Sequence, residues 1–299
     1  MSLPTDRRVL AAFLAVVLLG GTNLVLILVT TRELDPLWSA GLRFSGAAVL
    51  TILAARVVGS SMPRGRELRL AALYGLLGFG ISFGLFYTGT QRVPAGVASV
   101  VLGSVPLLTL LLASVQRLEP FRIRGLIGAC ITIAGIALIS SQAPDDTVPL
   151  LPLLAVVGAA VTAAQSSLTV RRIRDVHPLV VNAVGLTVGA IALLTFSRLS
   201  GESQALPVTT SARVAIVFMV LTTPVLFLLF VFVIQRWTAS AGSYVLVLFP
   251  LVSIPLAAIL LDESVSSSLL VGAPLVVVGV YVGALAPGVA ERVSPSAGE

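Results

Sequence analysis

The chain of 299 residues is strongly apolar: 57% of its residues are hydrophobic and 11% are charged, whereas soluble globular domains carry roughly 25% charged residues. This composition excludes an ordinary water-soluble domain. The formal net charge of +6 does not indicate nucleic-acid binding, because all the basic residues are arginines that occur singly or in short clusters between apolar runs.

Ten apolar stretches, taken in chain order, approach the roughly 20 residues that a helix needs to cross about 30 Å of hydrocarbon. We predict spanning helices over residues 9–29, 37–55, 70–89, 93–115, 123–140, 148–170, 179–196, 214–234, 239–261 and 267–286. The first stretch follows Arg7 and Arg8 as in a secretory signal, but it is longer than the apolar core of a signal peptide. We therefore expect it to be a retained helix.

The arginines also predict an orientation, since cytoplasmic connections hold an excess of positive charge. One set of alternate connections, together with both termini, carries most of the arginines. The other set has only Arg32, Arg92, Arg198 and Arg213, and it includes the acidic connections 142–147 and 262–266. The sequence therefore predicts a multi-pass protein of the bacterial inner membrane with cytoplasmic N- and C-termini.

The two halves of the chain resemble each other. Shifting the chain by 144 positions, which takes residue 91 to residue 235, aligns chemically distinctive residues without a gap: Gln91/Gln235, Ser99/Ser243, Leu102/Leu246, Pro106/Pro250, Glu119/Glu263, Gly128/Gly272 and Gly135/Gly279. A weaker match in the earlier helices pairs Asn23 with Gln165 and Pro36 with Pro178. These coincidences indicate an internal duplication.

A repeat with an odd number of spans enters the membrane from the opposite face when it recurs, and such inverted repeats are typical of transporters with a site near the midplane. We therefore predict an all-α integral membrane protein with ten transmembrane helices in two inverted five-helix repeats. The predicted repeats cover residues 1–146 and 147–288, and residues 289–299 are expected to form a disordered tail.

Several short motifs stand out in the order in which they occur. The first half opens with Gly21-Thr22-Asn23, Leu34-Asp35-Pro36 and the stretch 40–44, and it closes with the stretch 93–99, Pro106, Glu119, Gly128 and Gly135; residues 239–283 repeat this closing pattern. These motifs resemble the opening and the close of an EamA domain, from the EamA family in the drug/metabolite transporter superfamily. The resemblance implies a ten-helix, exporter-like carrier of amino acids or related metabolites. The aromatic amino acid exporters are one candidate type.

Candidate substrate-binding residues are polar positions inside apolar spans. Arg43 lies about 10 Å into its predicted helix, where a charge is costly and often functional; it could attract a substrate carboxylate, reach the external interface, or pair with Glu33 or Asp35. Asn23 and Gln165 could bind an ammonium or carboxylate group or simply join helices. Ser99, in the duplicated motif, belongs to the same candidate set.

Aromatic residues and prolines complete the candidate site. Phe83, Phe86, Tyr87 and Tyr244 could line an amphipathic cavity that accepts apolar side chains, or they could be ordinary packing residues. Pro106 and Pro250 interrupt helical hydrogen bonding at equivalent depths and free backbone carbonyl groups. They are either hinges for alternating access or static kinks.

The sequence does not suggest an enzyme, since it shows no paired carboxylates, no Ser–His arrangement and no Cys–His metal set near the midplane; Cys130 and His177 are each the only residue of their type. We expect no cofactor or metal. The expected partners are a small-molecule substrate and the lipid bilayer, with no nucleic acid, and the expected assembly is a monomer.

The function that these patterns favour is export of small metabolites, above all neutral or aromatic amino acids, by alternating access. Because no acidic residue lies deep in a predicted span, the export is expected to be facilitative or weakly coupled. Alternatives are efflux of hydrophobic cations, which related carriers achieve with a buried glutamate where this chain has Thr22 and Asn23, and a membrane receptor that binds without transport.

Overall fold

The computed structural model of the chain describes residues 7–118, 123–141, 149–236, 245–262 and 267–282. Tyr244, Glu119, Glu263 and the predicted tail lie outside these ranges. The described helices are α1 (Arg7–Thr31), α2 (Pro36–Val57), α3 (Gly65–Gly75), η1 (Leu76–Ser82), α4 (Phe83–Gly89), α5 (Ala95–Leu102), α6 (Val105–Val115), α7 (Ile123–Ser141), α8 (Leu150–Val170), α9 (Pro178–Leu199), α10 (Thr210–Arg236), α12 (Phe249–Leu261) and α13 (Ser267–Val280).

The helices confirm the ten predicted spans in order and approximate position. Within the described ranges, seven continuous helical stretches are long and apolar enough to cross a membrane: Arg7–Thr31, Pro36–Val57, Gly65–Gly89, Ala95–Val115, Leu150–Val170, Pro178–Leu199 and Thr210–Val233. Three shorter apolar stretches complete the ten: Leu126–Gly135, Val245–Leu261 and Ser267–Gly279. The second helix of each half begins with a proline, Pro36 or Pro178, at the position where the missing N–H costs no helical hydrogen bond.

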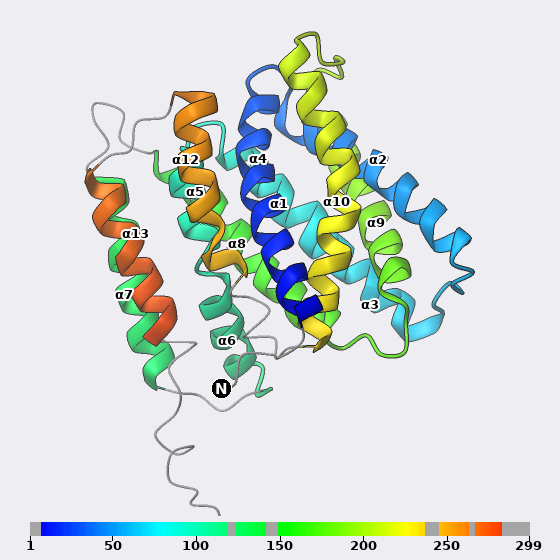
Figure 1. Ribbon diagram of the computed structural model, residues 1–299, viewed down its shortest axis with the longest axis horizontal. Helices are drawn as coiled ribbons and strands as arrows, with labels where there is room; N and C mark the ends of the chain where they lie inside the picture. The colour runs from blue at the N-terminus through cyan, green and yellow to red at the C-terminus, as the bar shows by residue number, and fades with distance from the viewer. Residues whose placement is uncertain (1–6, 119–122, 142–148, 237–244, 263–266, 283–299) are drawn as a thin grey trace, which may run out of the picture.

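The last helices of the two halves, α7 and α13, pack along one edge of the bundle (Figure 1). A β-carbon placed on Gly135 would lie 3.0 Å from the Gly272 carbonyl oxygen, and one placed on Gly279 would lie 2.7 Å from the Gly128 carbonyl oxygen. The later glycine of each helix therefore meets the earlier glycine of the other, which makes the two helices antiparallel. Equivalent glycines of the duplication exchange places in this contact, so the sequence repeat is also a structural one.

The first helix of each half packs against the third span of the other half. In the α1–α10 pair, Asn23 contacts Thr222 and Glu33 contacts Thr209. In the matching pair, a side chain on Gly89 at the end of α4 would meet Pro152 near the start of α8. Both pairs are antiparallel. Since consecutive spans alternate in direction, the third span runs parallel to α1, and α8, which is antiparallel to the third span, runs opposite to α1. This is the inverted five-helix arrangement expected from the sequence.

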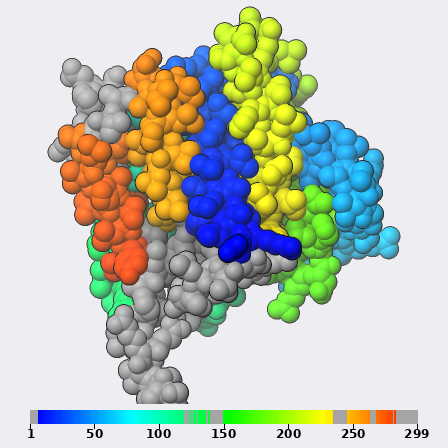
Figure 2. Space-filling view, in the orientation of Figure 1, coloured from blue at the N-terminus to red at the C-terminus, as the bar shows by residue number. Residues whose placement is uncertain are grey.

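The outer surface of the bundle is apolar, as contact with lipid requires. In α1, exposed leucines recur every fourth residue at Leu10, Leu14 and Leu18. In α10 the exposed face carries large aliphatic side chains: Val214, Val217, Leu221 and Val225. Figure 2 shows α1 lying between α12 and α10 on this side of the molecule. Among the described residues, Asn23, Arg43 and Asn182 are polar side chains buried inside the bundle.

Glycines in the third span allow close helix packing. A β-carbon on Gly78 would lie 2.4 Å from the Ser166 hydroxyl oxygen, and one on Gly89 would lie 2.8 Å from the Pro152 carbonyl oxygen. Around Gly78 the span widens into the π-helix η1. Wide turns of this kind are frequent at functional sites, and η1 supplies part of the cavity wall described below.

Candidate substrate-binding cavity

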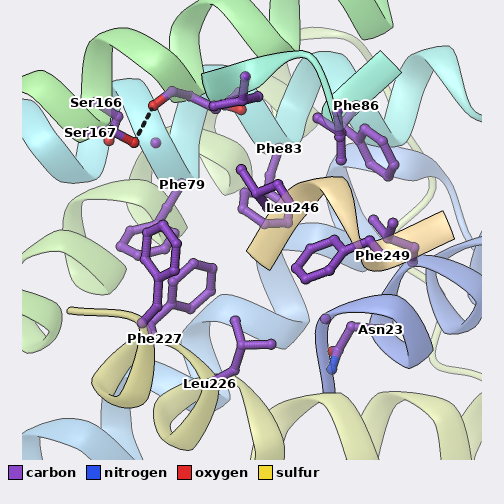
Figure 3. Close-up of a pocket in the computed structure, with 18 of the residues that line it drawn as sticks. Asn23, Phe79, Phe83, Phe86, Ser166, Ser167, Leu226, Phe227, Leu246 and Phe249 are labelled. Carbon is purple, nitrogen blue, oxygen red and sulfur yellow. Dashed lines mark hydrogen bonds between the residues drawn. The ribbon is translucent and has the colours of Figure 1, made fainter. Parts of the chain in front are cut away.

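A cavity of about 120 Å³ lies where the two halves meet. Its walls come from α1, α2, the third span, α5, α6, α8, α10 and the segment leading into α12. The residues that line it include Asn23, Arg43, Phe79, Phe83, Phe86, Phe227, Leu246 and Phe249. Figure 3 shows how the labelled rings and leucines surround this space. Both repeats therefore contribute to a single, mainly apolar cavity.

Arg43 is the cationic residue of the described cavity wall. It lies on α2, its side chain is 1% exposed, and it is held by groups from two other spans. The Arg43 Nε donates to the Thr223 hydroxyl at 2.8 Å and one terminal nitrogen donates to the Tyr87 hydroxyl at 3.3 Å. The guanidinium carbon also lies 5.1 Å from the ring centre of Phe44 and 5.4 Å from that of Phe83, close enough for cation–π attraction.

In the structure, Arg43 neither reaches the external interface nor pairs with Glu33 or Asp35. The side chain does not reach the surface, and the Glu33 carboxylate instead accepts from the Thr209 hydroxyl while Asp35 accepts from the Ser203 N–H. No carboxylate among the described residues forms an ion pair with the guanidinium. Since a guanidinium has five N–H donors and two are used here, a buried positive charge with spare donors faces the cavity.

Asn23 supplies a buried acceptor to the same cavity. Its Nδ2 donates to the Leu19 carbonyl oxygen at 2.7 Å and to the Thr222 hydroxyl at 3.3 Å. Its Oδ1 is buried and has no hydrogen-bond partner within the described residues. A buried acceptor without a donor costs free energy, so this oxygen is available to a ligand.

The other polar side chains of the wall already donate inside the protein. The Ser82 hydroxyl donates to the Ala159 carbonyl oxygen, and the Ser166 hydroxyl donates to the Tyr74 carbonyl oxygen at 3.1 Å. The Ser167 hydroxyl donates to the Ala163 carbonyl oxygen, and the Tyr74 hydroxyl donates to the Asn182 side chain. Spare capacity is thus concentrated in the cationic donor Arg43 and the acceptor Asn23. A neutral ligand with one negative and one positive end matches this pair.

Aromatic rings form the apolar part of the wall. The Phe79 and Phe227 ring centres are 4.6 Å apart with an edge-to-face geometry, and Phe83 lies 6.1 Å from Phe227. Phe83 and Phe86, predicted from the sequence, both line the cavity. Phe79 and Phe227 were not predicted. The spacing of Phe79, Phe83 and Tyr87 at every fourth residue could have identified Phe79, whereas nothing in the uniformly apolar sequence of α10 distinguishes Phe227.

Three other candidate residues lie away from the cavity lining. The Tyr87 hydroxyl accepts a hydrogen bond from Arg43 and so helps to position the guanidinium. The Ser99 hydroxyl is fully buried and donates to the Gly96 carbonyl oxygen at 2.8 Å. Gln165 accepts from Gln116 at 2.6 Å, which joins α8 to the segment after α6. Their roles in binding remain predictions, as does that of Tyr244, which lies outside the described residues.

The two candidate hinge prolines begin half-helices. Span four breaks at Gly103 and Ser104, and Pro106 then occupies the first turn of α6. In the second half, Leu248 interrupts the helix and Pro250 occupies the first turn of α12. The duplication has therefore placed equivalent breaks beside the cavity, and bending at these positions stays a prediction.

At one face of the bundle, the connection 32–35 is tied to the connection 200–209. The Glu202 carboxylate accepts from the backbone N–H groups of Leu37 and Trp38 at 3.1 and 2.8 Å. Its negative charge there also interacts favourably with the positive N-terminal end of α2. The Asp35 carboxylate accepts from the Ser203 N–H at 2.6 Å. Acidic side chains from each half thus cap backbone groups of the other half.

Glu33 makes the third such link. Its carboxylate accepts from the Thr209 hydroxyl and from the backbone N–H groups of Val208 and Thr209. The Thr209 hydroxyl contributes most, followed by the Val208 N–H, to a pKa of Glu33 that is lower than the ordinary glutamate value. Because the folded-state pKa is lowered, the link stabilises the fold above the pKa of an unfolded glutamate and is lost as the pH falls through the folded-state pKa.

We expect Glu33→Gln to lower the melting temperature at neutral pH, since the neutral amide accepts these hydrogen bonds less strongly than a carboxylate. Toward acid pH the wild-type carboxylate becomes protonated and resembles the amide, so the two melting curves should converge. Thermal unfolding of both proteins in detergent from pH 7 to pH 3 measures this. A difference that stays constant or grows toward acid pH would contradict the assignment.

Comparison with known proteins adds an independent observation. The family model described as the EamA-like transporter family matches residues 7–141 and again residues 150–284. The "Uncharacterized inner membrane transporter YedA" of Escherichia coli K12 is 28% identical over 198 residues, and the match spans 66% of this chain and 64% of that relative's length.

Two further similarities extend over nearly the whole chain. The "Probable amino-acid metabolite efflux pump" of Salmonella typhimurium is 29% identical over 285 residues, which covers 90% of this chain and 92% of that protein. A solved crystal structure matches with a TM-score of 0.68 at 21% identity and covers 97% of this chain and 100% of the other. The structural likeness supports the fold.

Proposed function

Because the chain belongs to the EamA-like transporter family, we propose that it exports small metabolites, and specifically neutral and aromatic amino acids, by alternating access. Alternating access suits two inverted halves that meet around one cavity. The name of the Salmonella typhimurium relative, which refers to an amino-acid metabolite efflux pump, is consistent with this class of substrate.

The observation that carries the proposal is the buried guanidinium of Arg43 on an aromatic-walled cavity. A charge at this depth needs a compensating partner, and a substrate carboxylate can supply one through paired charge-assisted hydrogen bonds. The rings of Phe79, Phe83 and Phe227 can then receive an apolar or aromatic side chain. A hydrophobic cation would place a second positive charge beside Arg43, which disfavours the drug-efflux alternative.

The residue types in the cavity wall also bear on what drives transport. The described lining contains no acidic residue that could bind and release a proton during the cycle. We therefore propose facilitative or weakly coupled export that is driven by the gradient of the substrate.

The distribution of arginines supports an orientation in a bacterial inner membrane with both termini in the cytoplasm. In this orientation the links of Glu33, Asp35 and Glu202 lie on the outer face. We further propose residues 1–146 and 147–288 as the two repeats, which agrees with matches of the family model at 7–141 and 150–284.

Efflux from proteoliposomes tests the substrate class and the coupling. Vesicles loaded with labelled phenylalanine should lose it faster than protein-free vesicles, without an imposed proton or sodium gradient. A labelled hydrophobic cation should leave at the protein-free rate. Strict dependence on a proton or sodium gradient would overturn the facilitative mechanism, and selective efflux of the cation would favour the drug-efflux alternative.

A further inference from the structure

Two backbone carbonyl groups beside the cavity have lost their helical donors. The carbonyl oxygen four residues before a proline cannot receive a helical hydrogen bond, since proline has no N–H. Pro106 and Pro250 stand in this relation to Leu102 and Leu246. Neither leucine carbonyl accepts a hydrogen bond from another group within the described residues.

These two leucines are brought together at the cavity. Leu102 and Leu246 both line it, and they are equivalent positions of the duplication. A β-carbon placed on Gly103, the residue after Leu102, would lie 3.7 Å from the Leu246 carbonyl oxygen. The breaks in the two half-helices therefore lie next to each other, with no side chain at Gly103 to separate them.

A third acceptor without a donor belongs to the same wall. Asn23 is 3% exposed, lines the cavity, and leaves its Oδ1 unpaired within the described residues. Unpaired acceptors in an apolar, membrane-embedded wall are unfavourable. A ligand that brings several N–H donors would satisfy them together.

We propose that the Leu102 and Leu246 carbonyl oxygens and the Asn23 Oδ1 form a subsite for the primary ammonium group of the substrate. An ammonium group has three N–H donors and a positive charge, whereas the guanidinium of Arg43 is the complementary group for a carboxylate. This inference rests on the proposed function and deepens it: the cavity selects amino acids over carboxylates that lack the amino group.

Ligand binding to the purified protein tests the subsite. L-phenylalanine and 3-phenylpropanoate share a ring and a carboxylate but only the first carries an ammonium group. Pro106→Ala and Pro250→Ala restore an N–H that can pair with the Leu102 or Leu246 carbonyl oxygen, and Asn23→Leu removes the third acceptor. Each variant should bind L-phenylalanine about tenfold more weakly, as expected for the loss of a charge-assisted hydrogen bond, and should bind 3-phenylpropanoate like the wild type.

Pro255→Ala is the matched control. It also restores an N–H in α12, but this N–H can pair with the carbonyl oxygen of Leu251. The Leu251 side chain is 71% exposed toward lipid, away from the cavity. This variant should bind both ligands like the wild type. Retained binding of 3-phenylpropanoate also shows that the other variants are folded.

Three results would overturn the subsite. The first is equal weakening of both ligands in the three variants, and the second is unchanged L-phenylalanine binding. The third is a wild-type affinity for L-phenylalanine that requires sodium and loses this requirement in the variants, which would assign the oxygens to a metal cation. Wild-type protein that binds neither ligand would refute the proposed function as well, so the two failures are distinguishable.

Discussion

Arg43→Gln is expected to lower the rate of phenylalanine transport by roughly ten- to a hundredfold. Glutamine retains an N–H donor but has no charge, so the substrate carboxylate would lose a charge-assisted contact of about 1.5–3 kcal/mol. The initial rate of efflux from proteoliposomes at subsaturating substrate measures the effect. Arg43→Lys should fall between the two, since lysine keeps the charge but cannot form the planar paired contact.

The control for this experiment is Arg198→Gln, which removes an exposed arginine at the end of α9 and should leave the rate unchanged. Phenethylamine, which lacks the carboxylate, distinguishes a binding role from a structural one. The Arg43→Gln cavity should admit this cation more readily than the wild-type cavity. A variant that transports phenylalanine at the wild-type rate would remove Arg43 from the binding site.

Phe227→Ala is expected to change side-chain selectivity. Phe227 contacts Phe79 and Phe83 in the wall, and each aromatic contact contributes about 0.5–1.5 kcal/mol beyond the burial of the ring. A substrate ring that packs on this cluster should therefore bind about tenfold more weakly. The concentrations of phenylalanine and alanine that half-saturate transport measure this change, and the value for alanine should stay nearly constant because its methyl group does not reach the wall.

Phe218→Ala provides the comparison within the same helix. Phe218 is 37% exposed on the outer surface of α10 and should have no effect on selectivity. If Phe227→Ala weakened phenylalanine and alanine equally, the ring cluster would be a structural element of the bundle and not a side-chain pocket.

The fold could be predicted because the bilayer restricts the backbone structures that a spanning segment can adopt. A long apolar stretch has to become a helix, and the distribution of arginines and acidic connections predicts the orientation of the helices. The duplicated glycines carried further information: Gly128, Gly135, Gly272 and Gly279 were predicted only as equivalent positions, and the structure makes them one reciprocal contact. The π-helical turn η1 had no sequence signal, because it depends on packing between the third span, α8 and α9.

The polar part of the cavity could be predicted where a polar residue interrupts an apolar span. Arg43 and Asn23 stand out for this reason, and both lie in the wall. Gln165 stands out equally in the sequence, but Gln116, which is distant in the chain, engages its side chain. Phe227 could not be predicted because a residue facing lipid and a residue facing an apolar cavity have the same character, so hydrophobic periodicity does not separate them.

Counterflow is the most direct measurement of the central claim, which is that this chain carries amino acids through the cavity at Arg43. Proteoliposomes preloaded with unlabelled phenylalanine are diluted into a trace of labelled phenylalanine. A carrier that alternates access should accumulate the label transiently above its outside concentration, and Arg43→Gln should abolish the overshoot. Binding of phenylalanine to the wild-type protein without any counterflow would contradict the claim and identify a receptor.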